Sequence, residues 1–426
     1  MSEEKIGNRN LVILGALIVQ LCLGSIYAWS FFQTALNGGI PPVGAYQWPS
    51  FFSQLPFAAG LASFALFMIF AGRWQDRVGP RKVATVGGVL LGIGYISAFF
   101  VDMVSGGDAL IGTIYLIITY GIIGGAGIGF AYVCPIAALV KWFPDKKGTI
   151  TGIAVAGFGA GALVFGYLEQ FLLVLYDVPT VAIIGMPMLI LGVIYLVLVV
   201  IGSQLLVNPP EGWLPPGYTP PATIADGAGT GMMPGEMIRT SSFWLLWLMF
   251  VFAATAGLMT LGNVKSAALA IDVTADAVIV VGVMSLLNAA GRIVWGATSD
   301  KLGRENTMIL MFITLAIGMF AFAYMSTIAI SWYAVMAIAS LIGFCFGGNF
   351  ALFPSATADF FGSKNVGKNY GVMFTAYGIA GITGAFVAGP IVDATGSYFM
   401  AFIVTGVLAI IAILFTLVLK SKRKNA

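Results

Sequence analysis

The sequence contains no histidine, only three cysteines among 426 residues, and only 9% charged residues. Without histidine there can be no histidine-based catalytic triad, no zinc site of the HExxH type and no histidine proton relay. Cys22, Cys134 and Cys345 lie in apolar segments and lack the spacing of a metal site or a disulfide framework. No phosphate-binding loop or nucleophile elbow occurs. We therefore expect no catalytic residues, no metal site and no cofactor, and we do not expect an enzyme.

Hydrophobic residues make up 59% of the chain, and its mean hydropathy is +0.98. Soluble proteins carry about 25% charged residues, so a water-facing surface cannot cover this much apolar material. The chain is therefore predicted to span a membrane many times. Its net charge of +3 is small and gives no indication of nucleic-acid binding. The N-terminal stretch lacks the pattern of a cleaved signal peptide, so the first span is expected to serve as its own insertion signal.

Twelve apolar segments are long enough to cross a bilayer as helices, because a span needs about 20 residues. They predict an all-α membrane protein with twelve transmembrane helices. Glycines recur every four residues in several segments, for example at Gly121, Gly125 and Gly129, which favours close helix packing. The predicted spans are 11–36, 50–72, 82–101, 109–140, 149–175, 181–206, 242–265, 277–298, 306–326, 331–354, 370–390 and 398–420.

One long polar connection, residues 207–241, separates the sixth span from the seventh. Its high content of proline and glycine predicts an irregular linker. The chain is therefore expected to divide into an N-terminal six-helix bundle at residues 1–206, a cytoplasmic linker at residues 207–241 and a C-terminal six-helix bundle at residues 242–426.

Lysine and arginine residues indicate the orientation, because cytoplasmic loops carry an excess of them. With the N-terminus inside, all but two of the 20 basic residues fall on the cytoplasmic side. Both termini are therefore predicted to be cytoplasmic. The two exceptions are Lys265 and Arg292, which lie within apolar spans and which topology does not explain.

An arginine at membrane depth costs about 2.5–3.5 kcal/mol on insertion scales, so one that is kept there usually holds an anion or a carboxylate partner. Arg292, in the eighth span, either does this or extends to nearby headgroups. Lys265, near the outer end of the seventh span, extends to the outer headgroups, draws anions inward, or acts as a second cation of the site. Asn263 and Gln33 could add neutral hydrogen bonds to a substrate.

The two halves repeat a charged turn: GRWQDRVG at residues 72–79 follows the second span, and GATSDKLG at residues 296–303 follows the eighth. GxxxDRxG is the inner-loop signature of the major facilitator superfamily, which the chain resembles over its whole length. The resemblance implies two pseudo-symmetric six-helix bundles with a site between them near the membrane midplane.

The charges of these turns are expected to form a conformational latch at the cytoplasmic helix ends, where acids can cap helices and pair with bases. The alternative is that they only hold the loops on the inside. The latch residues are Asp76, Arg77, Asp300 and Arg304.

Further motifs are YAWS at 27–30, KWFPDKKG at 141–148, GEMIRT at 235–240, GGNFALFPS at 347–355 and KNYG at 368–371. Together with Arg292 they resemble the oxalate/formate antiporter group, whose relatives include monocarboxylate transporters. The resemblance covers both halves and does not fix the substrate.

In the oxalate carrier of this group, an arginine of span eight and a lysine of span eleven hold the dicarboxylate within an aromatic cage. Arg292 matches the arginine, but Tyr377 stands at the lysine position. One fixed positive charge suits a monoanion better than a dianion, and a guanidinium can hold a carboxylate by two parallel hydrogen bonds. Aromatic residues in apolar helices also serve simply for packing. The resemblance places five of them in the cage: Tyr27, Tyr132, Phe346, Phe374 and Tyr377.

In animal-type monocarboxylate transporters, an aspartate four residues before the span-eight arginine helps to couple protons. Asn288 stands there in this chain; it cannot carry a proton as a carboxylate does, and we treat it as a candidate substrate-binding residue. Four acids near span ends are expected at the membrane interface: Glu169, Asp272, Asp276 and Asp359. If transport is proton-coupled, Glu169 is the candidate; a substrate that carries its own proton, or pure anion exchange, would need none of them.

These observations predict a secondary active transporter of small organic monocarboxylates, of the lactate, pyruvate or formate class, that works by alternating access as a proton symporter or an anion exchanger. The alternative is an oxalate/formate or other dicarboxylate antiporter. A carboxylate sensor is disfavoured, because the short loops leave no room for a signalling domain. The expected partners are a small organic anion, protons and the lipid bilayer, with no nucleic acid. The expected location is the plasma (cytoplasmic) membrane, where a monomer suffices.

Overall fold

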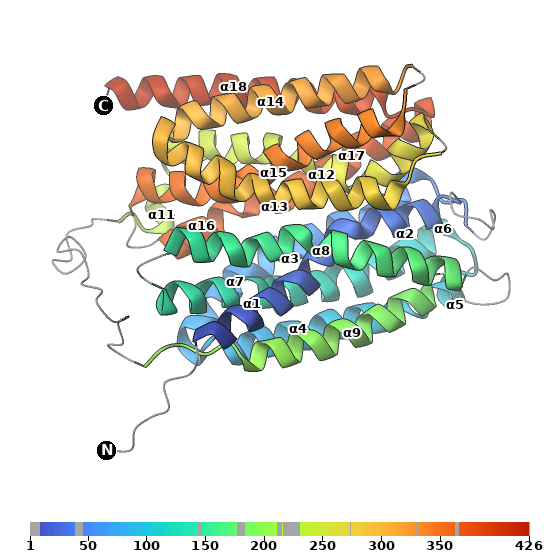
Figure 1. The fold of residues 1–426 in the computed structure, drawn as a ribbon, viewed down its shortest axis with the longest axis horizontal. Helices are drawn as coiled ribbons and strands as arrows, with labels where there is room; N and C mark the ends of the chain where they lie inside the picture. The colour runs from blue at the N-terminus through green and yellow to red at the C-terminus, as the bar shows by residue number, and fades with distance from the viewer. Residues whose placement is uncertain are drawn as a thin grey trace.

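The computed structural model describes residues 9–38, 46–143, 147–176, 184–210, 215, 231–272, 274–328, 330–362 and 366–425. Every regular element in these ranges is helical. The long helices run side by side in Figure 1, with α1 beginning and α18 ending at the left edge and α5 lying at the right edge. We call these the α11 end (left) and the α5 end (right) of the molecule, after the short helices found there.

The first half of the chain forms six long helical segments, two of which change helix type along their length. The π-helical segment η2 continues α6 into α7, as single π turns often do inside longer helices. The elements are α1 (Arg9–Gly24), the 3₁₀ helix η1 (Ser25–Ala28), α2 (Trp29–Leu36), α3 (Ser50–Val78), α4 (Pro80–Ala98), α5 (Val101–Ser105), α6 (Ala109–Leu116), η2 (Ile117–Gly124), α7 (Gly125–Trp142), α8 (Lys147–Leu175) and α9 (Gly185–Gln204).

The second half repeats this arrangement with six long segments, one of which is interrupted between α16 and α17. The elements are α11 (Pro234–Met237), α12 (Ser241–Ile271), α13 (Ala277–Leu302), α14 (Arg304–Met325), α15 (Trp332–Phe361), α16 (Val366–Met373), α17 (Thr375–Thr395) and α18 (Phe399–Asn425).

The all-α fold with two six-helix bundles is confirmed: each predicted span coincides with a helix or with a run of consecutive helices. Within the described residues, 11 helices are long and apolar enough to cross a membrane by themselves. The remaining predicted span is α4, whose Arg81, Lys82 and four glycines lower its mean hydropathy. It nevertheless packs along α9 and α7 like its neighbours.

The described part of the predicted linker is anchored to both halves. At its start, the Trp142 indole nitrogen donates to the carbonyl oxygen of Val207 at 2.7 Å. At its end, the backbone nitrogen of Met232 donates to Phe361 O at 2.9 Å, and Asn369 Nδ2 donates to Met232 O at 2.9 Å. The short helix α11 follows. Residues 211–214 and 216–230 of the predicted linker lie outside the described residues.

The two halves meet along α8 with α13 and α3 with α17. Figure 1 shows α8 and α13 side by side. Within the second half, α13 and α15 approach unusually closely. A Cβ on Gly291 would lie 2.0 Å from Phe344 O, and one on Gly347 would lie 2.0 Å from Asn288 O. These two glycines therefore let the helices that carry Asn288, Arg292 and Phe346 pack backbone to backbone.

Candidate functional site

Arg292 lies in the middle of α13, and only 4% of it is exposed. Its Nε and Nη2 both donate to Asn288 Oδ1, at 3.3 and 3.2 Å, one helical turn away. Its Nη1 is buried without a hydrogen-bond partner. Among the residues that the structure describes, no acid lies within ion-pair distance of Arg292. The guanidinium is therefore a buried charge with one unused donor group and no counterion among the described residues.

Asn288, predicted to bind substrate, contacts the arginine in this structure, and its role in binding stays a prediction. Its Nδ2 donates to Gly343 O of α15 at 3.2 Å, which leaves its Oδ1 facing the guanidinium. The side chain is fully buried. Asparagine thus supplies a neutral acceptor where an aspartate would supply a charge, and the positive charge of Arg292 remains uncompensated.

Aromatic rings cover the guanidinium. Arg292 Cζ lies 4.3 Å from the centroid of the Phe350 ring and 5.8 Å from that of Phe158. A cation over an aromatic face gains about 0.5–2 kcal/mol, more when water is excluded. Phe158 belongs to α8 and Phe350 to α15, so both halves of the chain contribute to this cover.

All five aromatic residues predicted for the cage lie in one ring network around this position. The Tyr132 ring lies 6.2 Å from that of Phe374, which lies 4.9 Å from that of Tyr377. The Phe346 ring lies 6.5 Å from that of Tyr377 and 5.9 Å from that of Tyr27. The network thus combines side chains from η1, α7, α15 and α17.

Several further members of the network were not predicted, among them Phe64, Phe158 and Phe350. The Phe64 ring lies 5.0 Å from that of Tyr132 and 5.4 Å from that of Phe374, while Phe158 and Phe350 complete the contacts around Arg292. Phe350 lies four residues after Phe346, so it shares its helix face, and that spacing was a usable signal. No sequence signal distinguishes Phe64 from the many other phenylalanines of the spans.

Two helix interruptions place site residues at this level. Span one changes to the 3₁₀ helix η1 at Ser25–Ala28, which contains Tyr27, and span eleven is interrupted at Phe374. The hydroxyls of Tyr27 and Tyr377 are 3.1 Å apart and join the two halves. Binding sites of transporters typically form where spanning helices are discontinuous.

Lys265 lies elsewhere. It is six residues from the end of α12 at Ile271, whereas Arg292 is fifteen residues from the start of α13 at Ala277. At 1.5 Å per residue their backbone positions differ in depth by about 13 Å. Its Nζ donates to Gln170 Oε1 at 2.6 Å and lies 4.3 Å from the centroid of the Phe31 ring. Only 3% of Lys265 is exposed, so the expectation that it extends to the headgroups is wrong.

Neighbouring polar residues join the halves at the α5 end. Gln33 Nε2 donates to Asn263 Oδ1 at 2.9 Å, and Asn263 Nδ2 donates to Gln54 Oε1 at 3.3 Å. The hydroxyls of Thr34 and Ser266 are 2.9 Å apart. Gln33 and Asn263 therefore bond to each other across the halves. Within the described chain, the side-chain hydrogen bonds between the halves lie at this end and at the Tyr27–Tyr377 pair.

Glu169 does not lie at an interface, and that prediction is wrong. It is fully buried in α8, because its face of the helix points into the first half rather than toward headgroups. The other three acids lie near helix ends, and their location at the membrane interface stays a prediction. Asp276 caps α13 by accepting from Ile279 N, and Asp359 accepts from Arg304. Half-buried Asp272 accepts from Thr274, whose hydroxyl and backbone nitrogen lower the pKa of the Asp272 carboxyl.

The predicted latch residues lie at the α11 end. Arg304 pairs with Asp300 at 2.8 Å and with Asp359 of α15 at 3.1 Å. Gly79 and Gly303, which end the two repeated turns, have φ of 88° and 82°, a conformation that favours glycine. Exposed Arg77 forms no ion pair that the structure describes, and the side chain of Asp76 lies outside its description.

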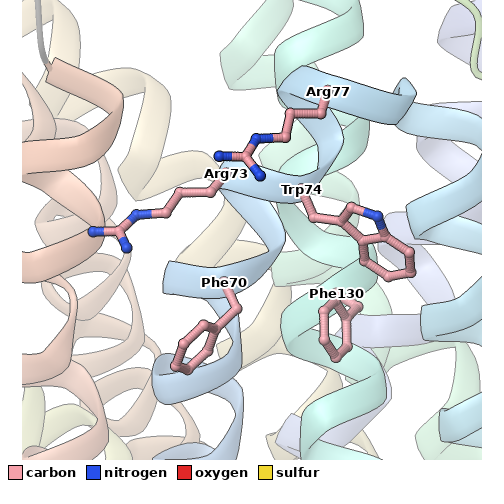
Figure 2. Close-up of a pocket in the computed structure, with 5 residues that line it drawn as sticks. All are labelled: Phe70, Arg73, Trp74, Arg77 and Phe130. Atoms are coloured by element: carbon pink, nitrogen blue, oxygen red, sulfur yellow. The ribbon is translucent and has the colours of Figure 1, made fainter.

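A cavity of about 460 Å³ lies at the same end, away from Arg292. Figure 2 shows Phe70, Arg73, Trp74 and Arg77 of α3 and Phe130 of α7 around it. Both arginines extend from the last turns of α3, and Trp74 lies beside Phe130, with ring centroids 5.7 Å apart. This cavity contains none of the predicted substrate-binding residues.

The arrangement around Arg292 can hold one negative charge in an aromatic, water-poor interior. A carboxylate there would gain a charge-assisted hydrogen bond from the unused Nη1 and the field of the whole guanidinium. Within the described residues, no group of three or more cysteines and acids could hold a metal ion.

Comparisons with known proteins agree with this architecture. The family model of the Major Facilitator Superfamily matches residues 11–385 and 276–426. The chain is similar to the uncharacterized MFS-type transporter YhjX of Escherichia coli (strain K12), with 30% identity over 88% of this chain and 86% of that protein. It is 28% identical to the oxalate:formate antiporter of Oxalobacter formigenes, over 96% of this chain and 91% of that protein. With apicoplast pyruvate carrier 1 of Toxoplasma gondii it shares 27% identity, over 85% of this chain and 80% of that protein.

Among solved structures, the inward open conformation of the xylose transporter XylE from E. coli has the same fold. The TM-score is 0.73 at 16% sequence identity, and the match covers 96% of this chain and 95% of that chain. At this identity the likeness concerns the fold alone.

Proposed function

Because the chain belongs to the major facilitator superfamily, we propose that it is a secondary active transporter of small organic monocarboxylates of the lactate, pyruvate or formate class. Alternating access of the two bundles would expose the Arg292 site to each side of the membrane in turn. The observation that carries the proposal is the buried guanidinium of Arg292, whose Nη1 lacks a partner and which has no acid partner among the described residues.

The charge count of the site supports a monoanion. Tyr377 stands where a dicarboxylate carrier of the related group has a lysine, and it bonds to Tyr27 rather than supplying a charge. The backbone of Lys265 lies at a depth that differs from that of Arg292 by about 13 Å, and its ammonium group bonds to Gln170. A dianion would leave one charge unpaired in a low-dielectric interior, which is costly.

The aromatic surroundings of Arg292 support a small substrate. Rings from both halves surround Arg292 at centroid distances of about 5–6 Å from one another, for example 5.1 Å between Tyr132 and Phe158. Apolar walls with a few polar groups are usual for small-molecule sites. The hydroxyls of Tyr27 and Tyr132 lie beside the guanidinium and could bond to the second carboxylate oxygen or to a keto or hydroxyl group.

Dicarboxylate exchange is the second candidate, favoured by the similarity to the oxalate:formate antiporter over almost the whole chain. It requires a second cation, and Lys265 is the one available within the described spans. Strong competition by oxalate, lost in the Lys265→Ala variant, would support this candidate against the first.

We also propose that the protein acts as a monomer in the plasma membrane with both termini in the cytoplasm. The distribution of basic residues supports this orientation, and the duplicated bundles supply both sides of the site within one chain.

Ligand-induced thermal stabilisation of the purified protein tests the substrate class. Lactate, pyruvate, formate, acetate and oxalate would be compared at equal ionic strength. A ligand at 100 times its dissociation constant adds about 2.7 kcal/mol of stability. We expect stabilisation by monocarboxylates and little by oxalate, and uptake of the stabilising compounds into proteoliposomes. Stabilisation by oxalate alone would reject the monocarboxylate proposal.

A further inference from the structure

Glu169 has a surrounding that the carboxylate site does not explain. It is fully buried, and its carboxyl oxygens form no hydrogen bond of normal geometry, although the Tyr195 hydroxyl approaches them. Three tyrosines approach it: Tyr95 of α4, Tyr120 of η2 and Tyr195 of α9, with ring centroids 5.2 Å apart for Tyr95 and Tyr120 and 5.0 Å apart for Tyr95 and Tyr195. The hydroxyls of Tyr120 and Tyr195 are also buried without a hydrogen bond of normal geometry.

One charged group of the other half reaches this cluster. Lys265 of α12 is the single cation that acts on Glu169 within the described chain, and Glu169 is the single acid that acts on Lys265. The two do not form an ion pair. The ammonium group donates instead to the neutral Gln170, next along α8, and lies over the Phe31 ring.

This geometry suits a neutral carboxylic acid better than a carboxylate. An ionised carboxylate that is buried without hydrogen bonds carries a large desolvation cost, which protonation removes. The remaining titratable groups nearby do not change this balance. Cys22 of α1 lies near Tyr195. The charged and phenolic groups of the aromatic site, namely Tyr27, Tyr132 and Arg292, are not among those that interact electrostatically with Glu169.

Glu169 is buried among tyrosines of the first half, and closure of the α5 end adds Lys265 from the second half to this surrounding. Lys265 and Gln170 belong to different halves, as do the bonded pairs Gln33 with Asn263 and Thr34 with Ser266. If the halves separate at this end, Lys265 leaves with α12 and opens a path for water to the cluster. A carboxyl group that water can reach ionises readily near neutral pH.

We propose that Glu169 is a proton-binding site whose protonation allows the α5 end to close. This deepens the proposed carrier function, on which it rests, by assigning the coupled ion and its residue. With the α5 end outside, a proton from the external solution would bind Glu169 in the open conformation and permit closure. By linkage, the conformation that binds the proton more tightly gains population as the pH falls.

The sign of the pH effect follows directly. The closed conformation holds the neutral acid, so acid favours closure of the α5 end and alkali favours its opening. An anionic substrate and a proton bound at separate residues would then cross together, with Arg292 as the anion site and Glu169 as the proton site.

Distances between spin labels measure this equilibrium without any substrate. Met103 of α5 and Tyr333 of α15 are 75% and 62% exposed. Tyr333 follows Trp332, whose backbone nitrogen bonds to Asp272 at the end of α12, so both label positions lie at the α5 end. Cysteines introduced there by Met103→Cys and Tyr333→Cys can be labelled selectively, since Cys22, Cys134 and Cys345 are buried.

We expect the population with the longer distance to rise about threefold or more between pH 5.5 and pH 8, a change that one titrating group can produce. In the Glu169→Gln variant, which mimics the neutral acid, the shorter distance should dominate at both pH values. Glu169→Asp should keep a pH response, and so should Asp276→Asn, a matched control at the same end that retains a capping side chain.

An unchanged pH response in Glu169→Gln would overturn the assignment, as would a pH-independent distance in the parent protein. Far-ultraviolet circular dichroism and gel filtration of each variant show whether it is folded. No carboxylate is added in the spin-label experiment, so its result does not depend on the thermal-stabilisation experiment that tests the substrate class. A protein that binds no carboxylate could still show the pH-dependent change in distance, and a carboxylate carrier could lack it.

Discussion

Arg292 and Lys265 present the same sequence signal, a single cation within an apolar helix, yet their surroundings differ. Arg292 lies at mid-depth among aromatic rings, is held by the neutral Asn288 and keeps one guanidinium nitrogen unpaired. Lys265 lies nearer a helix end in a polar layer, bonded to Gln170 with Glu169 as its nearby acid. Among the described residues, Arg292 has no acid within ion-pair distance, whereas Lys265 has Glu169 nearby without forming an ion pair with it.

The comparison teaches that a buried charge indicates a ligand site only when the protein supplies no counterion. A buried cation without a partner is costly, so its retention points to an anion that arrives from outside. A buried cation beside an acid forms part of an internal balance that a conformational change can alter. The experiments below separate these two roles, beginning with the largest expected effect.

Removal of the Arg292 charge should abolish carboxylate binding. Truncating one partner of a buried charge pair costs about 2–5 kcal/mol, so we expect Arg292→Ala to weaken binding by about 100-fold or more. Arg292→Lys keeps the charge without the planar guanidinium and should lose less. Ligand-dependent thermal stabilisation measures both. Normal stabilisation of Arg292→Ala would end the assignment of the anion site.

Neutralising Glu169 should uncouple transport from the proton gradient. In Glu169→Gln proteoliposomes, accumulation of labelled pyruvate driven by an inward proton gradient should fall about tenfold, since the coupled proton has lost its site. Exchange of labelled for unlabelled pyruvate at equal pH should persist, and it serves as the control for a functional protein. Gradient-driven accumulation equal to that of the parent would contradict the proton-site role.

A second cation placed in the aromatic cage should change the preferred charge of the ligand. Tyr377→Lys adds a positive charge beside Tyr27, and the ratio of oxalate to pyruvate affinity should rise about tenfold, equivalent to 1.4 kcal/mol. Tyr377→Phe removes the same hydroxyl without adding charge and controls for the lost hydrogen bond. If this cage does not determine which ligand charge the protein prefers, Tyr377→Lys and Tyr377→Phe would have equal ratios of oxalate to pyruvate affinity.

Loss of the Lys265 charge should leave carboxylate affinity nearly unchanged. The separation in depth of about 13 Å places Lys265→Met outside the anion site, so the dissociation constant for pyruvate should change by about twofold or less. Competition binding against the parent measures it. A loss comparable to that of Arg292→Ala would show that the two cations hold one ligand, which is the dicarboxylate arrangement.

Much of the fold was predictable because the hydropathy and the length of a segment largely determine whether it spans a membrane as a helix. Each span was located, and α4, which falls short on hydropathy alone, was located as well because its apolar run follows the charged turn at 72–79. The predicted helix ends were less accurate, since α12 continues to Ile271 and α15 to Phe361. A helix can extend beyond the hydrocarbon region of the membrane, so the end of its apolar run does not mark the end of the helix.

The site was predictable where motifs mark it. Tyr27, Tyr132, Phe346, Phe374 and Tyr377 form one ring network with Arg292 above it, as the resemblance implied. Their role in binding stays a prediction.

Other features depend on which way a side chain points around its helix. No sequence motif distinguishes Phe64 from the other phenylalanines of the spans. Glu169 and Lys265 lie close to helix ends, where sequence position suggests headgroups, but both face the protein interior. Position along a helix follows from the sequence, whereas the facing partner follows only from tertiary packing.

The close contact of α13 with α15 at Gly291 and Gly347 has a mechanical consequence. Asn288, Arg292 and Phe350 sit on two helices whose backbones touch, so they form one rigid unit belonging to the second half. Tyr27 and Phe158 belong to the first half. When the two halves rock against each other, an anion bound to Arg292 would therefore move with the second half. The rings of the first half would move past the anion, so that the site closes to one side of the membrane and opens to the other.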